Sequence, residues 1–306
     1  MKVYINRQPK TGPWGGGTKT INKFVQTLLS SGHTVVYTLQ DNDIDIIFCF
    51  DPRPNNFGEW YQDFLNYKAR NPRTKIVQRV GDLGTHSKPD LTSLVKQTID
   101  LSDYVIFPSL WAKEWIQFNK DNLSVIDNAP MKVFYENRKF NTDLNEKIKI
   151  VTHHWSTNPK KGFDIYKKFD NWCNQAGKYT FDYIGRLPDS LSLTNFKTPI
   201  SAEQLSVELP KYDIYLTASE EEAGANHVLE ALAAGLPIVY RESGGSIVNY
   251  CNHYGEGYSE FDEMINKVDK VIKNYSKLKQ RVLQYTKTND FVAEEYCRII
   301  TQLYEN

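Results

Sequence analysis

The sequence is poor in cysteine and has no cysteine pair at metal-binding spacing. Its 306 residues hold four cysteines, which are far apart along the chain. They are Cys49, Cys173, Cys251 and Cys297. This distribution excludes a disulfide framework and fits a reducing, intracellular setting.

Long apolar runs are also absent. No stretch reaches the roughly 18 apolar residues that a membrane-spanning helix requires. The N-terminal segment MKVYINRQPK has no apolar signal region. We therefore expect a soluble, cytoplasmic protein, and peripheral contact with a membrane stays open.

Neither sign of charge is in excess. Lys plus Arg and Asp plus Glu both number 37, so no overall field would attract nucleic acid. The sequence thus gives no support for a nucleic-acid partner. Apolar residues make up 40% and charged residues 24%, as in ordinary globular proteins. A chain of 306 residues exceeds the usual size of one hydrophobic core, which predicts two domains.

What the sequence does contain is a regular alternation of short β-rich runs and helix-length segments. Expected strands are 2–5, 34–39, 44–50, 75–80, 104–109, 123–126, 147–155, 179–185, 212–219 and 236–240. Helix-length segments such as 18–31, 59–70, 89–101 and 111–119 separate them. The alternation predicts parallel sheets with helices on both faces, in two doubly wound α/β domains.

The polar segment 131–146 lacks periodicity and is the expected linker. We predict a first domain over 1–140 and a second over 145–288, followed by a helix over 290–304 that packs back on the first domain. The lysine-rich face of 267–281 fits a solvated helix face, with a membrane or polyanion contact as the alternative.

In open α/β sheets, ligands bind beyond the carboxyl ends of the strands. After the first expected strand, Gly15, Gly16 and Gly17 precede a helix, where backbone and ligand approach closely. The spacing G-x-G-x-x-G of dinucleotide-binding proteins is broken, because its third glycine would fall on Thr20. A merely tight turn is the alternative.

In the second domain, the segment THHWSTNPKKGFDIY likewise joins an expected strand to a helix. Lys160 and Lys161 precede a helix, so ammonium groups lie beside backbone N–H groups, as phosphate oxygens require. His153 and His154 are neighbours on a strand and point to opposite faces, which argues against a shared metal. We expect no metal and no cofactor other than the substrate.

The stretch SEEEAGANHVLEALAAGLPIVY joins a strand end to an Ala-rich helix. Asn226 is the expected N-cap, and Glu230 reaches back toward the helix start. Carboxylates accept hydrogen bonds from paired hydroxyls, so Glu222 and Glu230 suit two sugars on either side of a diphosphate. That is the chemistry of a nucleotide sugar. A solvated acidic patch is the alternative for Glu220 and Glu221.

These motifs resemble glycosyltransferase family 4. EAGANHVLEALAAGLPIV is similar to the family motif in which seven residues separate two glutamates, here Glu222 and Glu230. LSDYVIFPSLWAKEWI, KKGFDIY, FDYIGRLPD and RESGGSIVNY extend the resemblance over nearly the whole chain. It implies GT-B architecture, two Rossmann-like domains whose parallel sheets face across a cleft. It also implies sugar transfer with retention of configuration and without a metal.

The resemblance also implies roles for individual residues. Glu222 would contact the donor sugar and Glu230 the nucleotide ribose, while Lys161 with Ser156 would neutralise the diphosphate. The remaining donor contacts implied are Gly16 and Gly17 from the first domain, and Gly185 and Arg186 beside the nucleobase.

Three departures from the family pattern affect these roles. The arginine that usually precedes the phosphate lysine is replaced by HHWS, where His154 or Lys160 would substitute and Trp155 offers a stacking ring. The loop between the glutamates reads AGANHV, so donor oxygens would meet Gly224, Ala225, Asn226 and His227. In the first domain, Asp82 is the expected polar catalytic residue, with Arg79 and His86 behind it; that Asp82 only caps a turn is the alternative.

The resemblance thus implies a retaining, metal-independent glycosyltransferase of the hexosyltransferase kind. It would move a sugar from a UDP- or GDP-sugar to a hydroxyl acceptor, such as a glycan. An NAD(P)-dependent oxidoreductase and a non-catalytic sugar-nucleotide-binding protein are the alternatives. Donor base, donor sugar, acceptor, linkage and oligomeric state are left open.

Overall fold

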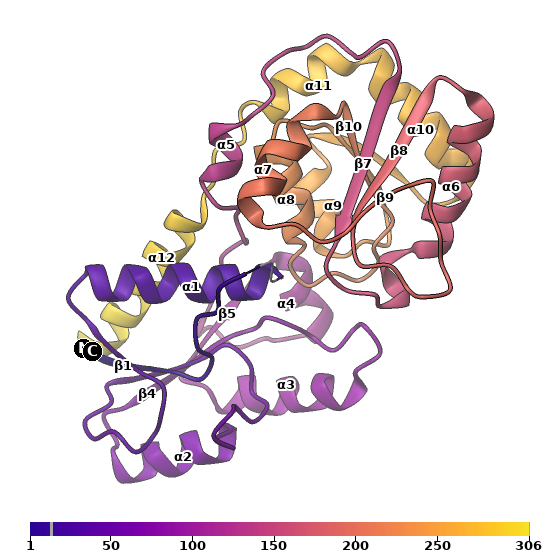
Figure 1. Cartoon of the computed structure of the whole chain (residues 1–306). Helices are drawn as coiled ribbons and strands as arrows, with labels where there is room; N and C mark the ends of the chain where they lie inside the picture. Colours follow the sequence, from indigo (N-terminus) through magenta and orange to yellow (C-terminus); the bar gives the residue numbers. More distant parts are fainter. Residues whose placement is uncertain (13–14, 306) are drawn as a thin grey trace. The chain divides into compact units, whose positions relative to one another are not determined.

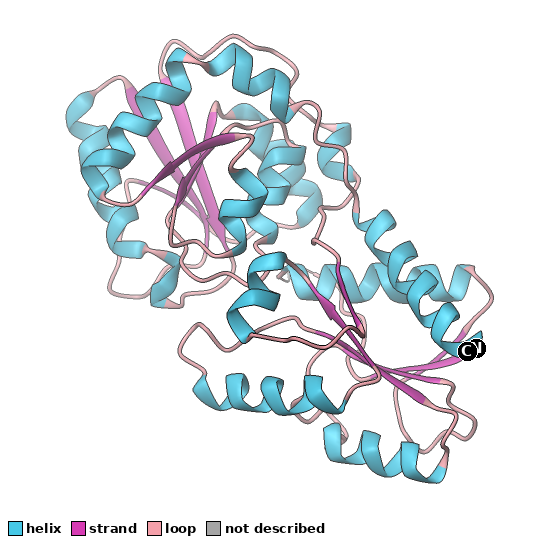
Figure 2. Ribbon diagram, turned by 180° about the vertical axis from the view of Figure 1, so that it is seen from behind, coloured by secondary structure: helices cyan, strands magenta, loops and turns pink. Residues whose placement is uncertain are grey.

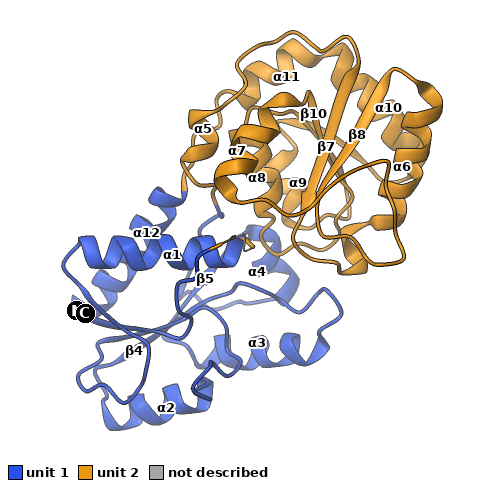
Figure 3. Ribbon diagram, in the orientation of Figure 1, with its two compact units in different colours: residues 1–11, 16–128, 289–306 blue, residues 12–15, 129–288 orange. Residues whose placement is uncertain are grey.

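The computed structural model describes residues 1–12 and 15–305. The chain forms two compact units, coloured separately in Figure 3. Unit 1 comprises residues 1–11, 16–128 and 289–306, and unit 2 comprises residues 12–15 and 129–288. Across the described residues, each unit has one six-stranded parallel sheet with helices on its faces (Figures 1 and 2). The doubly wound α/β class is therefore confirmed.

The sheet of unit 1 has the strand order β2-β1-β3-β4-β5-β6. Its strands are β1 Lys2–Ile5, β2 Thr34–Val36, β3 Ile46–Cys49, β4 Lys75–Arg79, β5 Tyr104–Phe107 and β6 Leu123–Val125. Its helices are α1 Gly16–Ser30, α2 Tyr61–Arg70, α3 Pro89–Leu101, α4 Leu110–Ile116 and α12 Asn289–Glu305.

Alternation along β3 divides the core of unit 1 between two faces. Ile47 packs with Tyr4 under α2, whereas the next residue, Phe48, faces α1 and α12. There Phe24 and Tyr296 lie 4.5 and 5.8 Å from the Phe48 ring, centroid to centroid. The last helix, α12, thus packs on α1 and β4 of unit 1.

The sheet of unit 2 has the order β12-β11-β10-β7-β8-β9. Its strands are β7 Ile148–His154, β8 Tyr179–Gly185, β9 Asn195–Lys197, β10 Ile214–Thr217, β11 Ile238–Arg241 and β12 Gly255–Tyr258. Its helices are α5 Val133–Glu136, α6 Phe163–Ala176, α7 Ala202–Glu208, α8 Asn226–Ala233, α9 Ser246–Cys251, α10 Phe261–Lys273 and α11 Tyr275–Val282. Two 3₁₀ turns, η1 Pro159–Lys161 and η2 Leu209–Lys211, complete the unit.

Two buried clusters lie on opposite faces of this sheet. Tyr215 of β10 packs with α8 and α9, while its neighbours Ile214 and Leu216 pack with α6 and α10. The segment ALAAGLP at the end of α8 is wholly buried, so its small residues allow the helix to lie close to the sheet.

Each sheet has one position where the strand order reverses. In unit 1, β2 lies on one side of β1 and β3 lies on the other, so the strand order reverses between the adjacent strands β1 and β3. In unit 2 the same relation holds between β7 and β10. Ligands of open α/β sheets bind at such switch points, beyond the strand ends.

The structure differs from expectation in three places. The strands β9 and β12 were not predicted, because NFK is a short exposed edge and GEGY carries two glycines. The expected linker contains the single-turn helix α5. The lysine-rich segment 267–281, expected to be a helix face, is divided between two helices, α10 and α11, which Asn274 separates. None of the described helices is long and apolar enough to cross a membrane.

Candidate active site

The loop that follows β10 carries the three adjacent glutamates at the switch point of unit 2. It is held by the segment after β11: the backbone N–H of Glu222 donates to the Gly244 carbonyl (3.1 Å), and that of Ser246 donates to the Glu222 carbonyl (2.9 Å). Gly245 has a φ of 70°, and a Cβ there would lie 2.7 Å from the Glu222 carbonyl oxygen. Only glycine allows this close approach, so the Gly-Gly turn fixes the position of Glu222.

Each of the three glutamates is paired with a cation. The 3₁₀ turn η1, which follows β7, supplies Lys160 to Glu221 and Lys161 to Glu222. Glu220 pairs with Arg241 at the end of β11. The pair of Lys161 and Glu222 is the most enclosed, with side chains 12% and 13% exposed. The stretch is therefore a network of ion pairs and not a solvated acidic patch.

Glu221 adopts a left-handed backbone conformation, with a φ of 49°. Such a conformation costs a non-glycine residue about 1–2 kcal/mol. Its N–H donates to the Ser243 carbonyl at 2.9 Å, and its carboxylate pairs with Lys160. These contacts hold the bend that carries Glu222 toward Lys161.

Glu230 of α8 is 4% exposed and contacts a histidine that the sequence did not assign to the donor site. The His153 Nε2 atom lies 2.9 Å from the Glu230 carboxylate, and its Nδ1 lies 3.1 Å from the Tyr215 hydroxyl. Alternation along the strand predicted that the two histidines would point to opposite faces. It could not show that His153 would be the partner of Glu230.

His154 points to the other face of β7 and is 4% exposed. Its Nε2 atom lies 2.6 Å from the Tyr166 hydroxyl, which also accepts a hydrogen bond from the Ala218 N–H at 2.9 Å. The ring of His227 lies 4.7 Å from that of His154, centroid to centroid. His154 thus lies beneath the site among aromatic rings.

His227 lies in the first turn of α8 and is uncharged at neutral pH. Burial lowers its pKa to about 3, and its Nε2 atom is 3.0 Å from the Thr217 hydroxyl. The helix begins at Asn226, and its N-cap is Ala225, so the expectation that Asn226 is the N-cap is wrong. The Asn226 amide instead donates to the Gly224 carbonyl at 3.3 Å. The N-cap residue Ala225 has no side-chain oxygen to cap this helix start, and its own N–H donates to the Ser246 hydroxyl at 3.1 Å.

The remaining predicted donor contacts of unit 2 lie at the ends of β7 and β8. The Arg186 guanidinium stacks on the Trp155 ring at 3.9 Å from its centroid. Gly185 pairs with His154 in the β7–β8 register, which brings Arg186 to this position. Ser156 is exposed, and its hydroxyl accepts from the Asn158 N–H at 3.2 Å.

Five further residues singled out from the sequence belong to unit 1, namely Gly16, Gly17, Arg79, Asp82 and His86. Gly16 and Gly17 form the start of α1. Asp82 follows β4, accepts from the Gly84 N–H at 2.8 Å and pairs with Lys88 at 2.7 Å. Arg79 is 3% exposed at the end of β4. Asp82 thus does cap a turn, and a catalytic role for it stays a prediction.

The arrangement at the end of β7 and β10 combines cations with hydroxyl acceptors. Lys160, Lys161 and the start of α8 supply positive charge for phosphate oxygens. Glu222 and Glu230 supply carboxylates for hydroxyls. Within residues 1–12 and 15–305, no three His, Cys, Asp or Glu side chains are grouped as metal ligands.

No protein-family model matches the chain, and no curated protein matches it. Several solved structures, however, are similar to this chain. Sucrose-phosphate synthase from Thermosynechococcus elongatus is 12% identical with a TM-score of 0.71, over 99% of both chains. WaaG, a glycosyltransferase of lipopolysaccharide biosynthesis, is 14% identical with a TM-score of 0.69, over 98% of this chain and all of that one. HepE from Anabaena, solved with UDP-glucose, is 16% identical with a TM-score of 0.63, over 99% of this chain and 98% of that one. At such identities the likeness is one of fold, and this chain has the GT-B fold of these proteins.

Proposed function

We propose that the protein is a retaining glycosyltransferase that moves a sugar from a nucleoside-diphosphate sugar to a hydroxyl acceptor. The observation that carries the proposal is the pairing of Lys161 with Glu222 at the switch point of unit 2, in the loop before α8, which carries Glu230 one turn from its start. The fold supports it, because HepE was solved with UDP-glucose and the pneumococcal O-GlcNAc transferase GtfA with UDP and GlcNAc.

The chemistry follows from the charges. In the reaction, the bond from the anomeric carbon to the diphosphate oxygen breaks, and a bond to the acceptor oxygen forms on the same face of the sugar. The diphosphate gains negative charge as it leaves, so a cation placed beside it lowers the barrier. Lys161 is that cation, with Lys160 and the start of α8 close by. These groups are the reason for proposing a reaction that needs no metal.

Donor binding changes the partners of the site. Lys161 would exchange the Glu222 carboxylate for a phosphate oxygen, which leaves Glu222 to accept hydrogen bonds from the donor sugar. Glu230 would accept from the ribose beside His153. Trp155 and Arg186, already stacked, offer a flat surface to the nucleobase.

A thermal-shift panel with UDP, GDP, ADP, NAD and NADP tests donor recognition. We expect one nucleoside diphosphate to raise the melting temperature, since a ligand that binds only the folded state stabilises it. Lys161→Ala should abolish the shift. Lys168→Ala is the matched control, because Lys168 is exposed on α6 and outside the site.

A shift with NAD or NADP alone would contradict the proposal and favour an oxidoreductase. Nucleotide binding without release of nucleoside diphosphate from the matching nucleotide sugar, across acceptors, would instead indicate a binding protein.

A further inference from the structure

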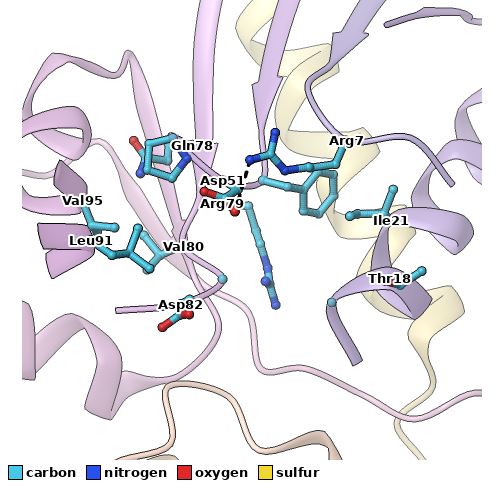
Figure 4. A pocket seen from close by; sticks show the side chains of 14 residues that line it. Arg7, Thr18, Ile21, Asp51, Gln78, Arg79, Val80, Asp82, Leu91 and Val95 are labelled. Atoms are coloured by element: carbon cyan, nitrogen blue, oxygen red, sulfur yellow. Dashed lines mark ion pairs between the residues drawn. The ribbon is translucent and has the colours of Figure 1, made fainter. Parts of the chain in front are cut away.

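Unit 1 contains a cavity of about 260 Å³ at its own switch point. The cavity lies where β1, β3 and β4 end, between α1 and α3 (Figure 4). Its polar lining consists mainly of Arg7, Thr18, Asp51, Gln78, Arg79 and Asp82.

Arg79 is the most unusual of these residues. Its side chain extends between Asp82 and Thr18 in Figure 4, and the residue is only 3% exposed. Its Nη2 donates to the Asn128 amide oxygen at 2.6 Å and its Nε donates to the Tyr296 hydroxyl at 3.3 Å. Both partners are uncharged. Among the described residues, no carboxylate forms an ion pair with Arg79, although buried charges are ordinarily paired.

The third nitrogen of this guanidinium, Nη1, lies over Gly81. A Cβ at Gly81 would be 2.9 Å from Nη1 and 3.3 Å from the Phe50 carbonyl oxygen. The missing side chain thus leaves room for Nη1 at the cavity wall. None of the hydrogen bonds among the described residues uses Nη1, so it is available to a ligand.

Gln78 adds a second donor without a partner. It is fully buried on β4, and its amide oxygen accepts from the Ser102 hydroxyl at 3.4 Å. Its amide nitrogen finds no acceptor among the described residues. This nitrogen is itself enclosed, so it is an unsatisfied buried donor beside the cavity and not a group that contacts a ligand in it.

The two carboxylates that line the cavity, Asp51 and Asp82, are paired with other cations and not with Arg79. Asp51 pairs with Arg7 at 3.2 Å and with Arg53 at 2.7 Å. Asp82 pairs with Lys88 at 2.7 Å. With these partners included, four cations face two carboxylates, so one surplus charge belongs to the cluster of Arg7, Asp51 and Arg53 and the other to Arg79.

We propose that this cavity binds an anionic oxygen group, a phosphate or a carboxylate, and that the acceptor of the reaction therefore carries one. Arg79 offers a planar donor that matches the geometry of both groups. The start of α1, which contributes Gly17 and Thr18 to the cavity, adds the positive end of a helix dipole. A neutral acceptor would leave Arg79 with its uncharged partners alone. Calling the ligand the acceptor rests on the proposed function, whereas anion binding does not.

Calorimetric titrations with glucose 6-phosphate, glucuronate and glucose test this inference and separate its two sources. We expect at least one anionic sugar to bind at least ten-fold more tightly than glucose, and the tighter of the two identifies phosphate or carboxylate. Arg79→Gln should weaken this binding at least ten-fold and Arg79→Lys by less. Arg70→Gln, which removes an exposed arginine of the same unit, should leave it unchanged. Equal affinities for all three sugars, no binding of any, or full binding by Arg79→Gln would overturn the inference.

A second variant covers the chance that Arg79→Gln does not fold. Gly81→Ala keeps every charge and displaces Nη1, and we expect several-fold weaker binding of the anionic sugar with an unchanged circular dichroism spectrum. Lys161→Ala should bind the anionic sugar normally, and Gly81→Ala should bind the nucleoside diphosphate normally. Loss of nucleotide binding alone would thus count against the proposed function, and loss of anion binding alone against this inference.

Discussion

The two units place their polar side chains at the same topological position but balance charge in opposite ways. At the switch point of unit 2, Lys160, Lys161 and Arg241 each have a glutamate partner, and His153 contacts Glu230. At the switch point of unit 1, the enclosed Arg79 has only uncharged partners. In one crevice each of these lysine and arginine side chains is already paired before a ligand arrives, whereas in the other Arg79 has no carboxylate partner among the described residues.

The difference shows how a ligand must act in each crevice. In unit 2 a diphosphate has to take Lys161 from Glu222, and the freed carboxylate then needs hydroxyl donors. A nucleotide sugar brings both groups in one molecule, whereas inorganic phosphate brings only one. In unit 1 nothing has to be exchanged, so an anion alone is sufficient. The same fold position thus selects a bifunctional ligand in one unit and a simple anionic group in the other.

Removing one partner of the Lys161–Glu222 pair is the strongest test of the role that this difference assigns to unit 2. We expect Lys161→Ala to lower kcat about 10²- to 10³-fold, because the leaving diphosphate loses a charged donor. Glu222→Ala should have a similar effect, since the sugar loses its acceptor. Release of nucleoside diphosphate measures both, and circular dichroism checks the fold.

Lys168→Ala should keep the activity of the unaltered protein, because Lys168 lies on the exposed face of α6. If Lys161→Ala and Glu222→Ala both retained normal kinetics, the site at the end of β7 and β10 would not be the site of transfer.

The position of Lys161 also depends on the backbone, which two glycines of α6 allow to be tested. Gly162 has a φ of 81°, and a Cβ there would lie 2.5 Å from the Ala218 carbonyl oxygen. Gly177, at the other end of α6, has a φ of 75° with no atom within 4 Å of its Cβ position. Gly177→Ala should cost about 1–2 kcal/mol from the left-handed conformation alone. Gly162→Ala should cost about 3 kcal/mol or more, since η1 and β10 must also separate.

Urea denaturation of the two variants measures this difference. Equal losses would show that the contact between Gly162 and Ala218 adjusts freely, and Lys161 would then not be held by the backbone.

Hydrophobic patterning predicted most of the fold. Among the described residues, ten of the twelve strands fall on runs such as 2–5 and 104–109, because buried parallel strands are continuous apolar segments. The strands β9 and β12 were not predicted, since NFK and GEGY have pairing partners but few apolar residues of their own. The break at Asn274 was also hidden, because apolar residues continue at helical spacing on both sides of it.

The site was predictable where neighbours in sequence carry it and unpredictable where the sheet brings distant residues together. Glu222, Glu230 and Lys161 follow from motifs and spacing. The contact between His153 and Glu230 spans 77 positions and depends on the β7–β10 register, which no local pattern contains. The same holds for Arg79 and Tyr296, which are 217 positions apart.

His227 allows a pH test of how enclosed the unit 2 crevice is. Its pKa is lowered from 6.5 to about 3, mainly by burial and also by Lys161 and His153, against the opposing effect of Glu222 and Glu230. Below pH 6.5 the unfolded chain therefore binds a proton that the folded chain does not, so stability falls as pH falls from 6.5 toward 3. The slope for one such proton is about 1.4 kcal/mol per pH unit.

His227→Gln keeps a partner for Thr217 and removes this titration. Urea unfolding at pH 6.5 and pH 5 should show that the unaltered protein loses about 2 kcal/mol more than the variant over this interval. Parallel losses in the two proteins would mean that His227 is accessible to protons in the folded state.

The smallest effect is expected at the edge of the unit 1 cavity. Lys88 pairs with Asp82 where their side chains are 47% and 39% exposed, so Lys88→Ala should change the free energy of unfolding by less than about 1 kcal/mol. The substitution should change the affinity for the anionic sugar more clearly, because the Asp82 carboxylate would then repel the anion without Lys88 to balance its charge. We expect a two- to five-fold weaker affinity, roughly 0.4–1 kcal/mol, which fades as salt is raised and the exposed charge is screened. Tighter binding after loss of Lys88 would mean that Asp82 favours the ligand, and the cavity would then recognise a hydroxyl or a cation beside Arg79.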